Sequence, residues 1–274
     1  MRARQQMATN RDDALVLRRT PYGESSLVVQ ALTRTNGRVH FIAKGAFRHT
    51  SGYYCVLDLF DELTIEWSMP KNQDLGTLRR AGITTIRRKL CASPDRYRRA
   101  VEILELCELA AQPGERSSKL FELASEALDA LEDESQDELA VLVVFELRFL
   151  QNLGLAPSLR RCASCGGTAE VLQENRDVTE RRIAFSAGAG GRLCLPCARD
   201  ARATGRRVGT LPQQLVEDAS NLSQRGLVAA KELSSEALEE ARSFAERFMD
   251  YHLQTRPKSR RGKSLLPVWE KSQR

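Results

Sequence analysis

The chain has 274 residues, of which 42% are hydrophobic and 28% are charged, and its formal net charge is +6. At roughly 150 residues per domain, that length predicts two or three compact units. The seven cysteines are an odd number without a regular framework, which argues against a secreted disulfide scaffold and favours a reducing cytoplasm.

The sequence gives no sign of a membrane segment or of a secretion signal. The longest apolar run, residues 139–145, is far too short to span a bilayer. The N-terminus lacks the apolar core of a signal peptide. We therefore expect an intracellular protein.

The charge is unevenly distributed along the chain. Residues 1–90 carry 15 Lys and Arg against 8 Asp and Glu, residues 91–160 carry 7 against 14, and residues 161–274 carry 20 against 14. Two basic ends flank an acidic middle, which favours a polyanionic partner. A solvated surface would explain the same asymmetry.

The N-terminal third reads as a set of short strands. Residues 1–12 are polar and are expected to be disordered. The expected strands are residues 14–18, 26–32, 38–44, 54–59, 63–67 and 76–88. Short strands with polar turns and no helical pattern between them favour a small barrel or sandwich, and a barrel with basic loops is typical of the OB-fold.

The clearest hairpin turn is Asn36-Gly37, because both residues tolerate a positive φ. Alternation after this turn places Val39, Phe41 and Ala43 on one face of a strand. The other face carries Arg38, His40 and Lys44.

Basic residues on this hairpin and on the last strand are candidates for contacts with a nucleic-acid backbone. The hairpin set is Arg34, Arg38, Lys44 and Arg48. The set on the last strand is Arg79 and Arg80, which Arg87 and Arg88 extend. A third set, in the basic tail, is Lys258, Arg260 and Arg261, where a solvated tail is the alternative.

Four aromatic residues could stack on bases or fill the barrel core: Tyr22, Phe47, Tyr53 and Tyr54.

After Pro94 the apolar period changes from two to 3.6, which predicts helices. The expected helices are residues 98–111, 117–131, 137–150, a stretch after residue 212, and 235–251. Ser117 and Asp137 are the candidate N-caps of the second and third helices. The pattern predicts a packed bundle.

Two Cys-x-x-Cys pairs interrupt the helical region. They are Cys162 with Cys165 and Cys194 with Cys197. A two-residue spacer lets both thiolates of a pair face one ion, and two pairs complete a tetrahedral shell for a structural Zn²⁺. Unpaired or disulfide-bonded cysteines are the alternative.

No catalytic site can be identified in the sequence. The three histidines, His40, His49 and His252, are too dispersed for a hydrolase cluster. The triplet at residues 262–264 imitates the end of a phosphate-binding loop, but Pro257 stands where that loop needs its first glycine. We expect a protein that is not an enzyme.

Several segments taken in chain order resemble the RecO family of bacterial recombination mediators. They are residues 14–26, 32–38 and 43–46 near the N-terminus, 145–148 and 153–157 leading into 161–166, and finally 251–253 and 258–260. The resemblance spans about residues 13–261.

This resemblance implies an α+β protein with an N-terminal OB-fold β-barrel, an all-α helical domain and an inserted zinc-ribbon-like module with four cysteine ligands. The expected boundaries are a disordered N-terminus at 1–12, the DNA-binding barrel at 13–90, the two parts of the helical domain at 91–158 and 206–255, the zinc insert at 159–205 and the basic tail at 256–274. The loop between the cysteine pairs is long for the family, and residues 173–191 are where an extra hairpin is expected.

The resemblance also implies binding of single- and double-stranded DNA and annealing of complementary strands in the cytoplasm, in association with the nucleoid. Implied partners are RecR, the C-terminal tail of the single-strand binding protein SSB and, indirectly, RecA, which replaces SSB during repair. No membrane and no small-molecule substrate is expected. From the residues alone, a zinc-ribbon assembly adaptor with incidental nucleic-acid binding is the alternative, and an RNA-modifying enzyme is a weaker one.

Overall fold

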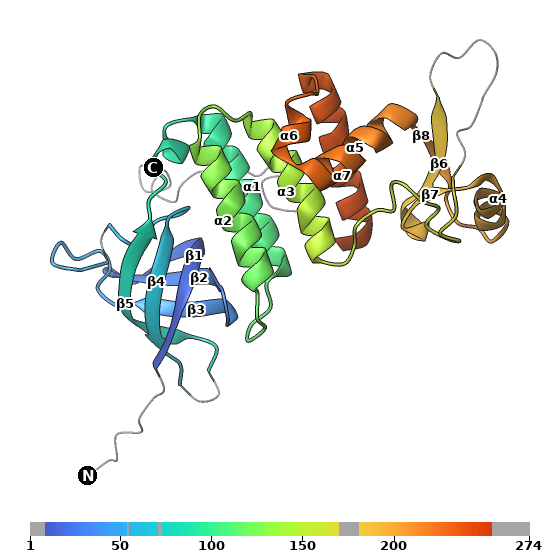
Figure 1. Cartoon of the computed structure of the whole chain (residues 1–274). Helices are drawn as coiled ribbons and strands as arrows, with labels where there is room; N and C mark the ends of the chain where they lie inside the picture. Colours follow the sequence, from blue (N-terminus) through green and yellow to red (C-terminus); the bar gives the residue numbers. More distant parts are fainter. Residues whose placement is uncertain (1–8, 54, 71–72, 170–180, 254–274) are drawn as a thin grey trace, which may run out of the picture. The chain divides into compact units, whose positions relative to one another are not determined.

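The computed structural model of the chain describes residues 9–53, 55–70, 73–169 and 181–253. They form two compact units, one within residues 1–135 and the other within residues 136–256 (Figure 1). No helix in these described stretches is both long and apolar enough to cross a lipid bilayer.

The first unit begins with a closed five-stranded barrel. Its strands are β1 (Thr9–Tyr22), β2 (Ser26–Thr33), β3 (Gly37–Ala43), β4 (Glu62–Ser68) and β5 (Gly76–Thr85). They follow the order β1-β2-β3-β5-β4, and all neighbours are antiparallel except β3 and β5. This OB-like barrel, with the helices that follow it, confirms the expected α+β fold class.

The alternation expected in β3 is confirmed. Val39, Phe41 and Ala43 are buried and belong to the barrel core. The Asn36-Gly37 turn is also present, and Gly37 has a φ of 65°. A Cβ at Gly37 would clash with the carbonyl oxygen of Gln112, so this turn needs glycine for its backbone angle and for the close approach of a second segment.

The expected disorder of residues 1–12 is wrong for residues 9–12, because β1 begins at Thr9. Thr9 pairs with Ser68 of β4. The carboxylate of Asp12 is buried and accepts hydrogen bonds from the β2–β3 turn. The polar residues of this stretch therefore take part in strand pairing and stabilise the β2–β3 turn.

The strand expected at residues 54–59 is also wrong: residues 55–59 form turns and bends, and Tyr54 lies outside the described residues. Leu57 is buried in the barrel core without strand pairing. Phe60, directly after this stretch, is buried with a φ of 75°, which interrupts an extended backbone. This apolar stretch packs into the barrel core as a loop, and alternation of apolar residues does not by itself distinguish such a loop from a strand.

Two helices complete the first unit: α1 (Pro94–Ala110) and α2 (Ser118–Glu132). Ser93 caps α1 by accepting a hydrogen bond from the backbone N–H of Arg96. Ser117 occupies the N-cap position of α2 but makes no capping bond, because its hydroxyl donates to the carbonyl of Glu115 instead. The helices expected as one domain over residues 91–158 are thus divided, with α1 and α2 in the unit that holds the barrel.

The second unit is built around α3 (Glu138–Asn152), which contacts α5 (Gln213–Arg225), α6 (Leu227–Ala230) and α7 (Ser235–Leu253). The expected N-cap is confirmed, since the carboxylate of Asp137 accepts from the N–H of Ala140. Residues 139–147 of α3 are all buried, which explains an apolar pattern without a polar face.

A small sheet and a helix follow α3 in the chain. The sheet contains β6 (Arg182–Ser186), β7 (Gly191–Leu193) and β8 (Gly209–Pro212) in the order β7-β6-β8, and α4 (Leu195–Ala203) follows β7. We call residues 159–169 and 181–212 the metal module. Because β8 pairs with β6, the module extends beyond the boundary expected at residue 205. The β6–β7 hairpin lies at the end of the region where an extra hairpin is expected.

Candidate metal centre and nucleic-acid interface

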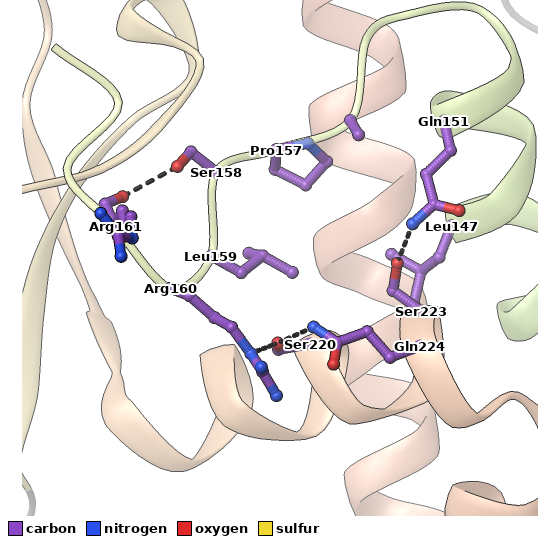
Figure 2. A pocket seen from close by; sticks show the side chains of 11 residues that line it. Leu147, Gln151, Pro157, Ser158, Leu159, Arg160, Arg161, Ser220, Ser223 and Gln224 are labelled. Atoms are coloured by element: carbon purple, nitrogen blue, oxygen red, sulfur yellow. Dashed lines mark hydrogen bonds between the residues drawn. The ribbon is translucent and has the colours of Figure 1, made fainter. Parts of the chain in front are cut away.

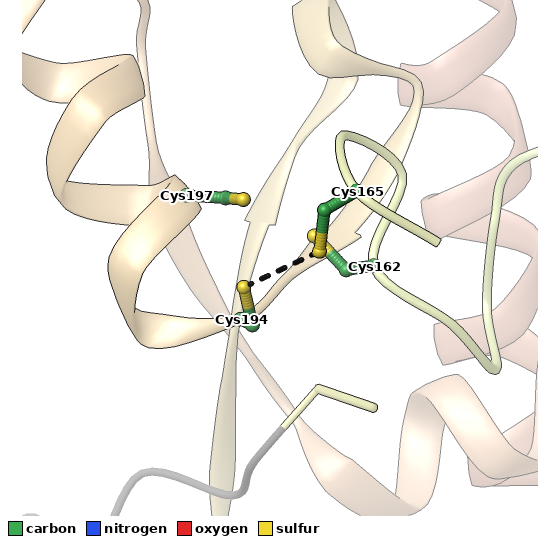
Figure 3. Close-up of side chains that lie close together, drawn as sticks. All are labelled: Cys162, Cys165, Cys194 and Cys197. Atoms are coloured by element: carbon green, nitrogen blue, oxygen red, sulfur yellow. Dashed lines mark hydrogen bonds between the residues drawn. The ribbon is translucent and has the colours of Figure 1, made fainter. Parts of the chain in front are cut away.

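The four cysteines of the metal module converge on one point. Figure 3 shows Cys162 and Cys165 on the loop that follows α3, facing Cys194 and Cys197 at the start of α4. Their four sulfur atoms all lie within 4.8 Å of one another. The Sγ atoms of Cys165 and Cys194 are 3.8 Å apart, whereas a disulfide would need about 2.05 Å. The four cysteines are therefore not joined by disulfide bonds in this structure.

Each pair of cysteines lies on a local structure that aims both sulfurs inward. The first pair lies on a tight turn, in which Gly166 has a φ of 72° and donates its N–H to the carbonyl of Cys162. In the second pair, Cys194 is the N-cap residue of α4 and Cys197 lies in the first turn. Arg192 connects the two pairs by donating to the carbonyl oxygens of Leu159 and Ala169.

The donor set fits a tetrahedral thiolate site. A Zn–S distance of about 2.3 Å places the sulfurs of a regular tetrahedron about 3.8 Å apart. Desolvation opposes ionisation of Cys162, yet backbone hydrogen bonds from Cys165, Cys194 and Ser164 lower the pKa of its thiol to about 6. Four converging sulfurs, one of them readily ionised, are the chemistry that a zinc ion requires. Such a site leaves no coordination position open for substrate.

On the barrel, two of the predicted DNA contacts are engaged within the protein. The guanidinium of Arg34 lies 2.8 Å from Glu122 and 4.6 Å from the ring centroid of Phe121. Arg38 donates a 3.0 Å hydrogen bond to the carbonyl oxygen of Glu108. Both side chains therefore attach the β2–β3 hairpin to the helices of the first unit.

The other two hairpin candidates, Lys44 and Arg48, are exposed in the loop that follows β3. This loop is joined to the β1–β2 turn, since Phe47 donates its N–H to the carbonyl of Ser25 at 3.0 Å. Tyr22, at the end of β1, is 62% exposed, and Phe47 is 44% exposed. We call Tyr22, Lys44, Phe47 and Arg48 the barrel-end surface. It combines two cations with two exposed aromatic rings, which suits phosphates and bases.

The candidates on β5 have mixed environments. Arg79 and Arg80 are exposed; Arg79 donates to the hydroxyl of Ser68, and the side chain of Arg80 is 83% exposed. The hydroxyl of Tyr53 donates to the carbonyl of Arg79, so the loop after β3 also touches β5.

The expected role of Arg87 in a surface patch is wrong, because its side chain is 1% exposed. It binds Asp129, Ser125 and the carbonyl of Phe60. Arg88 is exposed and pairs with Asp58 and Asp61. The three tail candidates, Lys258, Arg260 and Arg261, lie outside the described residues.

The second unit also has a cavity with a volume of ≈ 390 Å³, which no motif in the sequence predicts (Figure 2). Its walls come from the end of α3, from residues 156–161 and from α5. Gln151 donates to the hydroxyl of Ser223, and Arg160 donates to that of Ser220. Its polar walls are thus held together by hydrogen bonds between elements that the sequence does not show to be neighbours.

Comparison with known proteins gives a consistent result over most of the chain. Residues 7–87 match the family model "Recombination protein O N terminal", and residues 92–261 match "Recombination protein O C terminal". A DNA repair protein RecO from Anaeromyxobacter sp. (strain K) is 33% identical over 250 residues, which are 90% of this chain and 92% of the relative. A protein of the same name from Desulfatibacillum aliphaticivorans is 29% identical over 252 residues, which are 90% of this chain and 93% of the relative. A third, from Exiguobacterium sibiricum, is 31% identical over 182 residues, which are 66% of this chain and 68% of the relative.

Proposed function

The chain belongs to the RecO family of DNA repair proteins, and from that premise we propose that it is a mediator of recombination without enzymatic activity. In this proposal it binds single- and double-stranded DNA and anneals complementary strands. With RecR, it promotes the loading of RecA onto single-stranded DNA that SSB covers, and the C-terminal tail of SSB is its contact with that protein. Its place of action is the cytoplasm, at the nucleoid.

The observation that supports this proposal best is the barrel-end surface. Lys44 and Arg48 are exposed there and unpaired among the described residues, beside the exposed rings of Tyr22 and Phe47. Cations that neutralise phosphates release counterions, and aromatic rings stack on bases regardless of sequence. This is the combination that sequence-independent binding of single strands needs.

Within the proposal, the DNA contacts of the barrel are Lys44, Arg48, Arg79 and Arg80. Arg34 and Arg38 have a different role, because both side chains bind groups within the protein. They hold the barrel and the helices of the first unit together, and any contact they make with DNA is secondary.

We also propose that the metal is a structural Zn²⁺, held by Cys162, Cys165, Cys194 and Cys197. When bound, the ion would cross-link the turn that carries Cys162 and Cys165 to the start of α4, and it would supply no reaction chemistry. The converging sulfurs and the protein hydrogen bonds to Cys162 support this assignment.

The test is annealing of complementary oligonucleotides that are covered with SSB, without nucleotide and over a series of salt concentrations. We expect annealing faster than that of the oligonucleotides alone, with a steep loss as salt rises. If the protein binds neither strand form and does not anneal, the mediator proposal fails. Binding to a protein partner without DNA would then favour the adaptor reading.

A further inference from the structure

We propose that α4 and the turn that follows it form a second phosphate-binding surface, which contacts a nucleic-acid backbone through Arg199, Arg202, Arg206 and Arg207. The inference rests on the proposed function, because it assigns to the metal module the contact with the second of the two strands in annealing. It gives this module a role in binding in addition to its role in stability.

The metal module is strongly basic. Its residues 159–169 and 181–212 carry nine arginines and a single acidic residue, Asp200. With the intervening residues 170–180 counted from the sequence, the segment holds ten Lys and Arg against five Asp and Glu. The excess of positive charge remains even when all of those carboxylates are included.

The arginines of the module fall into two groups. Several are used internally: Arg160 binds Ser220, Arg182 binds Thr210, and Arg192 binds two carbonyl oxygens. The second group, Arg199, Arg202, Arg206 and Arg207, is exposed. Among the residues that the structure describes, no ion pair or side-chain hydrogen bond engages the guanidinium groups of this second group.

The second group lies on a backbone that is fixed at both ends. Ala198 and Ala201 bury the inner side of α4 against the module core, and the cysteine pair anchors its first turn. At the other end, Arg206 donates its N–H to the carbonyl of Ala201, and Gly205 has a φ of 79°. Together with the N–H of Gly205, which donates to the carbonyl of Arg202, this bond closes a Schellman motif that ends the helix.

The turn is fixed a second time, because the hydroxyl of Ser186 in β6 donates a 2.7 Å bond to the carbonyl of Arg207. Arg199 and Arg202 are three residues apart within α4, which places these two cations on one side of the helix, and Arg206 and Arg207 follow in the turn beyond it. Like charges at a spacing of three residues in a helix repel each other, and a polyanion removes that repulsion.

The chemistry of the surface favours nucleic acid over an acidic protein. None of the large hydrophobic side chains that are exposed elsewhere in the described residues belongs to the metal module. Protein interfaces usually centre on such apolar or aromatic anchors, whereas phosphate contacts need only positive charge. Without exposed aromatic rings to stack on bases, we infer contact with the backbone alone.

The experiment measures capture of a second strand. The full-length, zinc-loaded protein is bound to an immobilised oligonucleotide, and a labelled oligonucleotide that cannot pair with it is added over a salt series. The variant Arg199→Ala/Arg202→Ala/Arg206→Ala should still bind the first strand. For capture of the second strand, the logarithm of the binding constant falls with the logarithm of the salt concentration, and we call the steepness of this fall the salt slope. The salt slope of the variant should be smaller than that of the wild type by about 2, at about 0.7 per phosphate contact.

The matched control is Lys119→Ala/Lys231→Ala/Arg247→Ala, which removes the same charge from exposed positions outside the module and should leave capture unchanged. Bound zinc is measured for every variant. If the triple variant loses zinc, Arg206→Ala/Arg207→Ala changes only residues beyond α4 and should show a slope smaller by about 1.4.

Unchanged capture by the zinc-loaded variants would overturn this inference and leave the proposed function intact. Unchanged capture together with lost binding of an oligoglutamate peptide would also overturn it, in favour of a protein contact. If the wild type binds no DNA at all, the proposed function fails and the inference fails with it.

Discussion

Asp12 and Asn36 are joined by two hydrogen bonds to a single oxygen: the Oδ2 atom of Asp12 accepts from the backbone N–H of Asn36 at 3.1 Å and from its side-chain amide at 2.8 Å. The same oxygen accepts from the N–H and the hydroxyl of Thr35. One buried carboxylate in β1 thus fixes the β2–β3 turn. Although burial raises the pKa of Asp12, these bonds outweigh it and hold that pKa below its ordinary value.

The first prediction concerns Asp12→Asn and pH. A carboxylate whose pKa is lowered by folding contributes stability above its unfolded pKa of about 3.9, and this contribution is lost as the pH falls through the lower folded value. The substitution should therefore cost about 1–3 kcal/mol of unfolding free energy at pH 7. The difference from the wild type should shrink below about pH 4, as urea unfolding at several pH values would reveal. A difference that is constant down to the lowest pH would contradict it.

The second prediction concerns the buried Arg87, which lies 2.7 Å from Asp129. Arg87→Ala should lower the unfolding free energy by about 1–3 kcal/mol, because it leaves the carbonyl of the buried Phe60 and the hydroxyl of Ser125 without their donor. Arg98→Ala is the control, since Arg98 and its partner Asp95 are both exposed and their ion pair should contribute less than about 1 kcal/mol. Equal losses for the two variants in urea unfolding would speak against this account.

The third prediction separates the cations of the barrel. Lys44→Ala/Arg48→Ala should weaken binding of single-stranded DNA and reduce the salt slope by about 1.4, without a change in stability. Arg34→Ala/Arg38→Ala should instead lower stability, because these side chains bind Glu122 and the carbonyl of Glu108. Fluorescence anisotropy over a salt series and thermal unfolding measure the two effects. The reverse outcome would move the DNA contact to the β2–β3 hairpin.

The fourth prediction concerns the exposed rings. Tyr22→Ala and Phe47→Ala should each weaken binding of single-stranded DNA by about 1–3 kcal/mol. Binding of duplex DNA should change little, because its bases are already stacked. Tyr22→Phe keeps the ring and should bind as the wild type does. An equal loss for both DNA forms would mean that these rings position the loop and do not stack on bases.

The fifth prediction concerns the metal. Purified protein should contain one zinc ion per chain, and Cys194→Ser should lose it, because three thiolates do not complete the tetrahedral shell. Protease should then cleave within residues 181–212, since α4 is anchored by this cysteine pair. Cys55→Ser is the control, because Cys55 is exposed and lies outside the cluster. Atomic absorption measures the metal, and a metal-free protein with a protease-resistant module would exclude the zinc assignment.

Local patterns in the sequence were sufficient to predict β2, β3 and β4, the Asn36-Gly37 turn, the cap at Asp137 and the convergence of the four cysteines. Each of these depends on residues close together in the chain, such as a period of two, a positive φ or a Cys-x-x-Cys spacing. The apolar residues at 54–59 have a similar local pattern, yet the structure places residues 55–59 in a loop, because a strand also requires a partner with free hydrogen-bonding groups.

Only the tertiary structure decided which charged residues are buried, paired or exposed. Arg38, Lys44 and Arg87 look alike in the sequence, but Arg38 meets the end of α1, Arg87 is buried against α2, and Lys44 remains in solvent. The physical reason is that a cation interacts with whatever charge folding brings near it, from any distance along the chain. The sequence by itself determined how much positive charge the protein carries; only the fold determined which of these cations remain exposed to solvent.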